Sequence, residues 1–410
     1  MKRLIIGLVF IAVLVGAAIT ALPFLVSSEG VRAQIITKAA ALTGRQMSFR
    51  DAPKVFFNPY LGIEVGGVVF EGPREFPDDP PLVQMEKLRG RIAFLPALFG
   101  RIEVGQYEFI RPRFTLKVFH DGRASWQFPE GRVWDVLAQA RAKRQGTDAG
   151  AKPDLGGIAP VELGDFQIVD GIIDYESAPS QSREIITNLN VSVRWPDTAS
   201  AWTVRGSSIW RDEAIELSMR TAQPLLLLAG GTSAASGELK SGALRFNFEG
   251  DVNLLSGLHL AGTAKFASPS IPRIVNFFGG RIELGATPAA FEASGKLNAT
   301  PKQIQLSDAS ISIDGNQSRG VLQITFGERG RPQFNGTLAF QSLVLTPYLS
   351  ALRQEAEIGR TDTPGLLLLE RFDCDLRISA TKAMLGPVTA GDFGAALTVR
   401  NSELLFDLGS

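Results

Sequence analysis

Residues 189–195 read LNVSVRW, and this alternation of apolar and polar side chains decides the fold class. In an extended chain, Leu189, Val191, Val193 and Trp195 face one way and the residues between them face the other. The same period of two returns along about 350 residues from Tyr60 onward, which predicts roughly 15 to 18 half-buried strands. Strands and helices do not alternate regularly, which argues against a doubly wound α/β enzyme fold.

Composition argues against nucleic-acid binding, disulfide bonds and a metal site. Lys plus Arg and Asp plus Glu both number 42, so the chain lacks the basic excess with which nucleic-acid binders neutralise phosphates. We therefore expect no nucleic-acid partner. Cys374 is the single cysteine and allows no internal disulfide. His120 and His259 are the only histidines and lie too far apart in sequence for a recognisable metal site.

The N-terminal segment predicts a membrane anchor. Residues 4–26 carry no charge, and 23 helical residues reach about 34 Å, enough to cross a hydrocarbon core of about 30 Å. A cleaved secretory signal is the alternative, but its apolar region is shorter than this one. Lys2 and Arg3 precede the run, so we expect a single-pass inner-membrane protein with a cytoplasmic N-terminus and a periplasmic body. The anchor residues expected to contact lipid are Leu4, Ile5, Leu8, Phe10, Leu14, Leu22, Phe24 and Leu25.

Four regions are expected along the chain. Residues 1–26 form the cytoplasmic tip and anchor, and 27–128 form a unit that opens with a helix ending at Gly44. Residues 129–160 combine a helix (130–145) with a flexible linker rich in Gly and Pro, and 161–410 form a long β region. Further short helices are predicted at 272–278 and 348–358. The predicted fold is thus mainly β: an elongated, curved, antiparallel-rich sheet with a few short helices.

No motif predicts catalysis, a metal site or a cofactor. Ser294-Gly295-Lys296 resembles the end of a phosphate loop but lacks its first glycine and its magnesium-binding hydroxyl, so it is interpreted as a turn or bulge. Residues 120–122 (HDG) are interpreted as a tight turn. Asp373 and Asp375 could ligate a cation, although a solvated sheet face explains them more simply. Residues 170–173, 306–310 and 400–404 are interpreted as hairpin corners.

One face of the predicted sheet is apolar over its whole length. A sandwich would bury this face against a second sheet, whereas a curved single sheet would leave it open as a trough suited to acyl chains. The periodicity is compatible with both. The candidate groove-lining residues are Ile63, Val65, Ile92, Phe94, Leu189, Val191, Val193, Leu217, Phe246 and Leu376.

Several blocks resemble the AsmA family, TamB-like proteins anchored in the bacterial inner membrane. The most specific is LPALFGRIEV at 95–104, and the others are VRAQII at 31–36, TGR at 43–45, PYLGI at 59–63, IRPRF at 110–114 and GRASW at 122–126. Ser125 stands before Trp126 where the family often has Asn. The resemblance implies a periplasmic β-groove projecting from the inner membrane, a role in phospholipid delivery and outer-membrane biogenesis, and no catalytic residues.

Two non-enzymatic functions follow as hypotheses. In the first, the apolar groove shields or conducts phospholipid acyl chains between the inner and outer membranes. In the second, the chain is a scaffold or regulator that binds outer-membrane assembly proteins and carries no lipid. Bound phospholipid would support the first hypothesis, and a captured protein partner that is insensitive to charges on the apolar face would support the second.

Overall fold

The computed structural model describes residues 44–92, 104–126, 162–278, 290–347 and 372–409, with gaps at 58–60, 74, 77–78, 198–199, 256, 328–330 and 401, together with a few isolated positions at 33–40 and 138. The described chain forms two compact units, the first ending at Trp210 and the second beginning at Arg211. It is mainly β, with 20 strands and two short helices among these residues. None of the described helices is long and apolar enough to cross a membrane. The predicted anchor, 4–26, lies outside the described residues.

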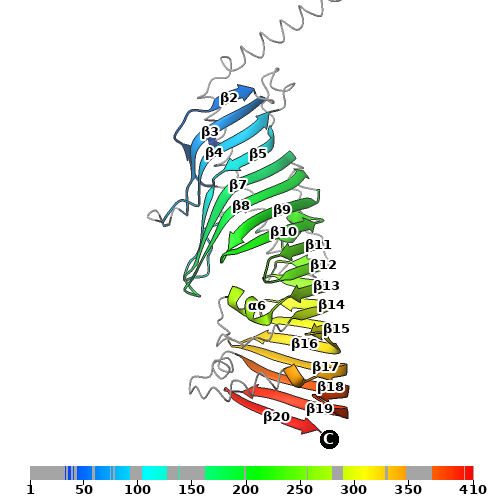
Figure 1. The fold of residues 1–410 in the computed structure, drawn as a ribbon. Helices are drawn as coiled ribbons and strands as arrows, with labels where there is room; N and C mark the ends of the chain where they lie inside the picture. The colour runs from blue at the N-terminus through cyan, green and yellow to red at the C-terminus, as the bar shows by residue number, and fades with distance from the viewer. Residues whose placement is uncertain are drawn as a thin grey trace, which may run out of the picture. The chain divides into compact units, whose positions relative to one another are not determined.

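Unit 1 is a sheet of nine described strands (Figure 1). β1 and β2 pair with opposite ends of β3, followed by β4, then by β5 and β6, then by β7, β8 and β9. The bounds are β1 Met47–Phe49, β2 Lys54–Phe57, β3 Leu61–Phe70, β4 Val83–Ile92, β5 Val104–Ile110, β6 Arg113–Val118, β7 Glu162–Ser177, β8 Ser182–Asp197 and β9 Trp202–Trp210. The prediction of roughly 15 to 18 strands falls short of the 20 that are described. Part of the difference is β1 and β2, which have three and four residues and are too short for alternation to reveal them.

The segment between β6 and β7 is a crossover within this sheet. β7 runs parallel to β5 and β6, which pair with its first and second halves. Parallel neighbours need a connection of a dozen or more residues, and 119–161 supply it. The predicted helix and linker, 129–160, lie outside the described residues apart from position 138, and the described strands on both sides of them belong to one unit. Linker composition indicates a long connection without specifying whether the flanking strands pair.

Unit 2 contains eleven described strands in chain order, from β10 to β20 (Figure 1). Every pair is antiparallel except β17 with β18. The strands are β10 Glu213–Thr221, β11 Thr232–Lys240, β12 Arg245–Asn253, β13 His259–Ser268, β14 Phe291–Thr300, β15 Gln303–Ile313, β16 Asn316–Phe326, β17 Pro332–Val344, β18 Asp373–Leu385, β19 Val388–Arg400 and β20 Glu403–Gly409; the helices are α5 Pro224–Leu228 and α6 Ile271–Phe277. The antiparallel-rich prediction is confirmed, with three parallel pairings as exceptions.

Two of the three predicted hairpin corners are wrong. Asp170 (φ 54°) lies inside β7 and Asp308 (φ 49°) lies inside β15, each at a shift in the strand register. Only 400–404 turns the chain, between β19 and β20. An Asp with positive φ suits a bulge as well as a turn, so the local residues do not separate the two. The bulge interpretation of Ser294-Gly295-Lys296 is confirmed, because these residues lie opposite the β15 bulge, where Lys296 Nζ is 2.8 Å from Asp308 Oδ2.

The predicted helix at 272–278, the helix end at Gly44 and the turn at 120–122 agree with the structure. The helix at 272–278 is α6, begun by Ser270, whose hydroxyl accepts a hydrogen bond from the Arg273 N–H. Gly44 has φ 70° and donates its N–H to the carbonyl of Ala40, as expected at a helix end. Residues 120–122 form a turn closed by the Gly122 N–H on the Phe119 carbonyl. The helices predicted at 130–145 and 348–358 lie outside the described structure, apart from residue 138, which is helical.

Candidate functional site

Cross-strand partners place apolar side chains in continuous rows on one face of unit 1. Residues directly opposite each other on paired strands share a face and contact each other. Two rows run from β3 to β9, and neither contains a charged residue. The Val191 row consists of Val65, Leu88, Phe109, Ile168, Val191 and Gly206, and the Val193 row consists of Ile63, Gly90, Tyr107, Phe166, Val193 and Val204.

The row between these two faces the other way and is polar. The Ser192 row consists of Glu64, Arg89, Glu108, Gln167, Ser192 and Arg205. Arg89 Nε lies 2.7 Å from Glu64 Oε2, and its Nη1 lies 3.4 Å from Glu108 Oε2. Partial burial raises the pKa of Glu64, but hydrogen bonds from Arg89 and Lys87 outweigh that effect and lower it overall. The sheet of unit 1 thus has one apolar and one charged face.

Unit 2 repeats this arrangement over more strands. The Leu376 row runs from β14 to β20 and the Cys374 row from β12 to β20, and neither contains a charged or polar side chain other than the Cys374 thiol. The rows are Leu297, Leu306, Leu322, Gly336, Leu376, Leu397 and Phe406, and Val252, Leu260, Ala299, Ile304, Ile324, Phe334, Cys374, Val399 and Leu404. The intervening row is polar through Asn298, Gln305, Gln323, Asn335 and Asp375.

The apolar faces are only partly buried. Three clusters are well packed, one around Val65 in unit 1 and two in unit 2 around Ile311 and around Phe248, the last including Leu227 of α5. Outside the clusters the rows are half-exposed, as at Ile168 and Val191. At β20, Leu404 is 54% exposed and Phe406 53%. All described strands of each unit belong to one sheet, so the described strands of neither unit form a second sheet that closes it into a sandwich.

The candidate groove-lining residues can now be placed. Ile63, Val65, Val191 and Val193 lie in the two apolar rows of unit 1, and Leu189 precedes Val191 by two residues in β8, beside the bulge. In unit 2, Leu217 and Phe246 share one row with Leu239 between them. Leu376 gives its name to a second row. Ile92 ends β4, but its side chain and the whole of Phe94 lie outside the described structure.

Sequence reasoning missed an aromatic group that ends the apolar face of unit 1. The rings of Tyr107 and Phe166 stack with centroids 5.3 Å apart. Trp195 and Trp202, on β8 and β9, meet edge to face at 5.7 Å. Burial raises the pKa of the Tyr107 phenol. The four residues come from four strands, and only Trp195 stood out in the strand pattern.

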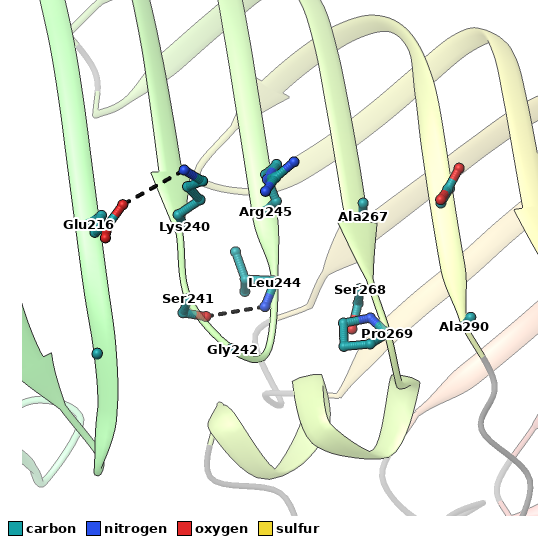
Figure 2. A pocket seen from close by; sticks show the side chains of 12 residues that line it. Glu216, Lys240, Ser241, Gly242, Leu244, Arg245, Ala267, Ser268, Pro269 and Ala290 are labelled. Atoms are coloured by element: carbon teal, nitrogen blue, oxygen red, sulfur yellow. Dashed lines mark hydrogen bonds and ion pairs between the residues drawn. The ribbon is translucent and has the colours of Figure 1, made fainter.

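A second candidate is a depression of about 640 Å³ on the polar face of unit 2, at the β11–β12 hairpin (Figure 2). Lys240 and Arg245 line it together with the carboxylates of Glu216 and Glu292, so its charges balance. Lys240 Nζ is 3.7 Å from Glu216 Oε2, as the dashed line in Figure 2 marks. The hairpin is held by the Ser241 hydroxyl, which accepts the Leu244 N–H. This mixture of paired charges favours neither an anion nor a cation.

Metal and thiol chemistry find no support in the described part of the chain. It contains no group of three His, Cys, Asp or Glu side chains that could hold a metal ion. Asp373 and Asp375 form ion pairs with Arg331 and Arg400, at 3.4 and 3.7 Å, so each carboxylate has a cationic side chain beside it. Cys374 is 3% exposed, and burial raises the pKa of its thiol above its usual range. A buried thiol of this kind is unreactive.

The comparison with known families gives a match that agrees with this architecture. The sequence model of the AsmA family matches residues 1–320, more than three quarters of the 410-residue chain. The chain belongs to the AsmA family. A search of the curated proteins found no match. The AsmA match spans unit 1 and the strands of unit 2 as far as residue 320 in β16, so it includes the apolar rows of unit 1 and the first strands of those in unit 2.

Proposed function

We propose that this AsmA-family protein is a non-enzymatic envelope protein whose apolar sheet faces shield or conduct phospholipid acyl chains between the inner and outer membranes. Anchorage through residues 4–26, with the body in the periplasm, is part of the proposal. One observation carries it: rows of apolar side chains cross six strands of unit 1 and up to nine strands of unit 2 without a charge.

The energetics of moving a lipid explain why such rows are useful. Exposing a 16-carbon chain to water costs about 12 kcal/mol, at about 0.8 kcal/mol for each CH₂ group. A carrier must therefore offer apolar contact at every point of the path. Eleven strands at a spacing of about 4.8 Å give unit 2 an apolar face about 50 Å across the strands. The polar face of the same sheet keeps the protein soluble on its other side.

A photocrosslinking amino acid placed on either face of β7 tests the proposal in the full chain in its native membrane. Ile168 lies in the Val191 row, and its neighbour Gln167 lies in the Ser192 row. We expect the crosslinker at position 168 to form adducts of phospholipid mass, and the matched crosslinker at position 167 to form few or none. Both variants must retain the melting temperature of the wild type.

The outcomes separate the candidate functions. Phospholipid adducts from position 168 alone support the proposal. Equal lipid labelling at both positions would indicate general contact with a bilayer and would overturn it. Protein adducts from position 168 without lipid would favour the scaffold that binds outer-membrane assembly proteins.

A further inference from the structure

Two tryptophans at one end of the apolar face of unit 1 carry indole N–H donors that no described residue accepts. Trp195 follows Val193 by two residues on β8 and so lies on the apolar face, and Trp202 begins β9 beside it. Both Nε1 atoms are buried, and neither has a hydrogen-bond partner in the part of the chain that the structure describes. A buried N–H without an acceptor destabilises a protein.

The contact between the two rings does not satisfy both donors. The indoles meet edge to face, with an interplanar angle of 66°. In this geometry the edge of one ring points at the face of the other, so at most one N–H reaches a π surface, and that contact is weak. Trp210 of the same sheet shows the ordinary arrangement, because its Nε1 donates to Glu184 Oε2 at 2.9 Å.

On the β7 side of Trp195, the described strands contribute glycines and no larger side chain to its row. Gly164 of β7 is the register partner of Trp195. A Cβ on Gly164 would collide with the carbonyl oxygen of Gly105, and a Cβ on Gly105 would meet nothing within 4 Å. Both residues are half-exposed although their Nε1 atoms are buried, so contact with a molecule on the apolar face requires a ring to turn its N–H outward.

We propose that Trp195 and Trp202 bind the ester carbonyls of a glycerophospholipid whose acyl chains lie along the Val191 and Val193 rows. The inference rests on the proposed function and specifies its cargo. The ester group of a glycerophospholipid matches both features of the site. Its carbonyl oxygen can accept a hydrogen bond from an indole N–H, and the acyl chains attached to it can cover the apolar rows. In bilayers, tryptophan is enriched at the membrane–water interface near the lipid ester groups, with its ring in the apolar region and its N–H at the polar boundary. A fatty acid carboxylate offers related acceptors but only one chain.

The test compares lipids that differ only in the acceptor. The purified full chain, stripped of lipid in mild detergent, is offered equal amounts of a diester phospholipid and its diether analogue with the same head group and chains, and bound lipid is counted by native mass spectrometry. We expect the wild type to prefer the ester lipid by about fivefold to tenfold, the ratio that one net hydrogen bond provides. A palmitate arm separates a phospholipid site from a fatty acid site.

Variants that keep the rings but remove the N–H groups are not available as natural residues, so the double variant Trp195→Phe with Trp202→Phe is paired with Trp210→Phe. The double variant should still bind lipid and should lose the preference for the ester, whereas Trp210→Phe should keep it. Three outcomes would overturn the inference while the proposed function stands. The wild type could bind ester and ether lipids equally, or the preference for the ester could survive in the double variant. The third outcome is stronger binding of palmitate than of either phospholipid. Binding of none of these lipids would overturn both.

Discussion

A charge in the Val191 row should block lipid, whereas the same charge one residue further along β8 should not. Val191 lies between Ile168 and Gly206 on the apolar face, and Ser192 lies between Gln167 and Arg205 on the charged face. Val191→Glu and Ser192→Glu therefore introduce the same side chain on opposite faces of one strand. The pair separates an effect of the face from an effect of the substitution.

The size of the effect follows from the surroundings of Val191. An acyl chain covering the half-buried valine loses about 1 kcal/mol of apolar contact when the residue becomes polar. Covering a carboxylate with hydrocarbon adds a desolvation cost of several kcal/mol. A sum of at least about 3 kcal/mol corresponds to binding weakened by about 100-fold or more. Without lipid the carboxylate remains partly hydrated, so we expect the folded protein to lose only about 1–2 kcal/mol of stability.

A phospholipid with a photoreactive group on its acyl chain provides the assay. The full-length variants are incubated with this probe in detergent, irradiated and analysed by mass spectrometry, and urea melts confirm that both are folded. We expect labelling of Val191→Glu to fall close to background and labelling of Ser192→Glu to match the wild type. Wild-type labelling of a folded Val191→Glu protein, or equal loss in both variants, would refute the assignment of the lipid to this face.

Three further predictions concern stability and reactivity. Gly164→Ala should lower the free energy of unfolding by about 2 kcal/mol or more, because Gly164 has φ 81° and an added Cβ would strike the Gly105 carbonyl. The control Gly105→Ala places its Cβ in open space and should change the free energy of unfolding by less than about 1 kcal/mol. Equal urea midpoints for the two variants would contradict this reasoning. Hydrogen bonds from Arg183 lower the pKa of Asp174, so its stabilisation is present above the ordinary carboxyl pKa of about 4 and is lost as the pH falls through the lowered pKa. Asp174→Asn should therefore cost about 1 kcal/mol in urea melts at pH 7, with a difference that shrinks in acid, and a difference independent of pH would count against the ion pair. Cys374 should react with iodoacetamide at pH 8 at least about tenfold faster in urea than in the native protein, and rapid native labelling would show that the Cys374 row opens.

Part of the fold could be predicted because it depends on residues close together in sequence. The period of two in 189–195 and in 372–378 needs only the next few side chains, and these segments lie in strand β8 and at the start of strand β18. The turn at 120–122 and helix α6 are local in the same sense. Bulges and hairpin corners favour the same residue types, so the bulges in β7 and β15 were predicted as hairpin corners.

The partners of each strand could not be predicted. β7 pairs with β5 and β6 across more than 40 residues of intervening chain, and β17 pairs with β18 across 28, and no local pattern encodes which strands meet after so long a connection. The division into two compact units after Trp210 likewise depends on which strands meet, and no local pattern marks it.

The apolar character of one sheet face was determined by the sequence, because alternation within each strand specifies which side chains share a side. The alignment of those side chains into rows was decided by the tertiary structure, because a shift of one residue in any pairing would have moved a strand's apolar set to the charged face. The same register brings Trp195 against Trp202 and beside Gly164, from strands that are separate in sequence. The candidate lipid contacts therefore combine a property of single strands with a register that only the folded sheets provide.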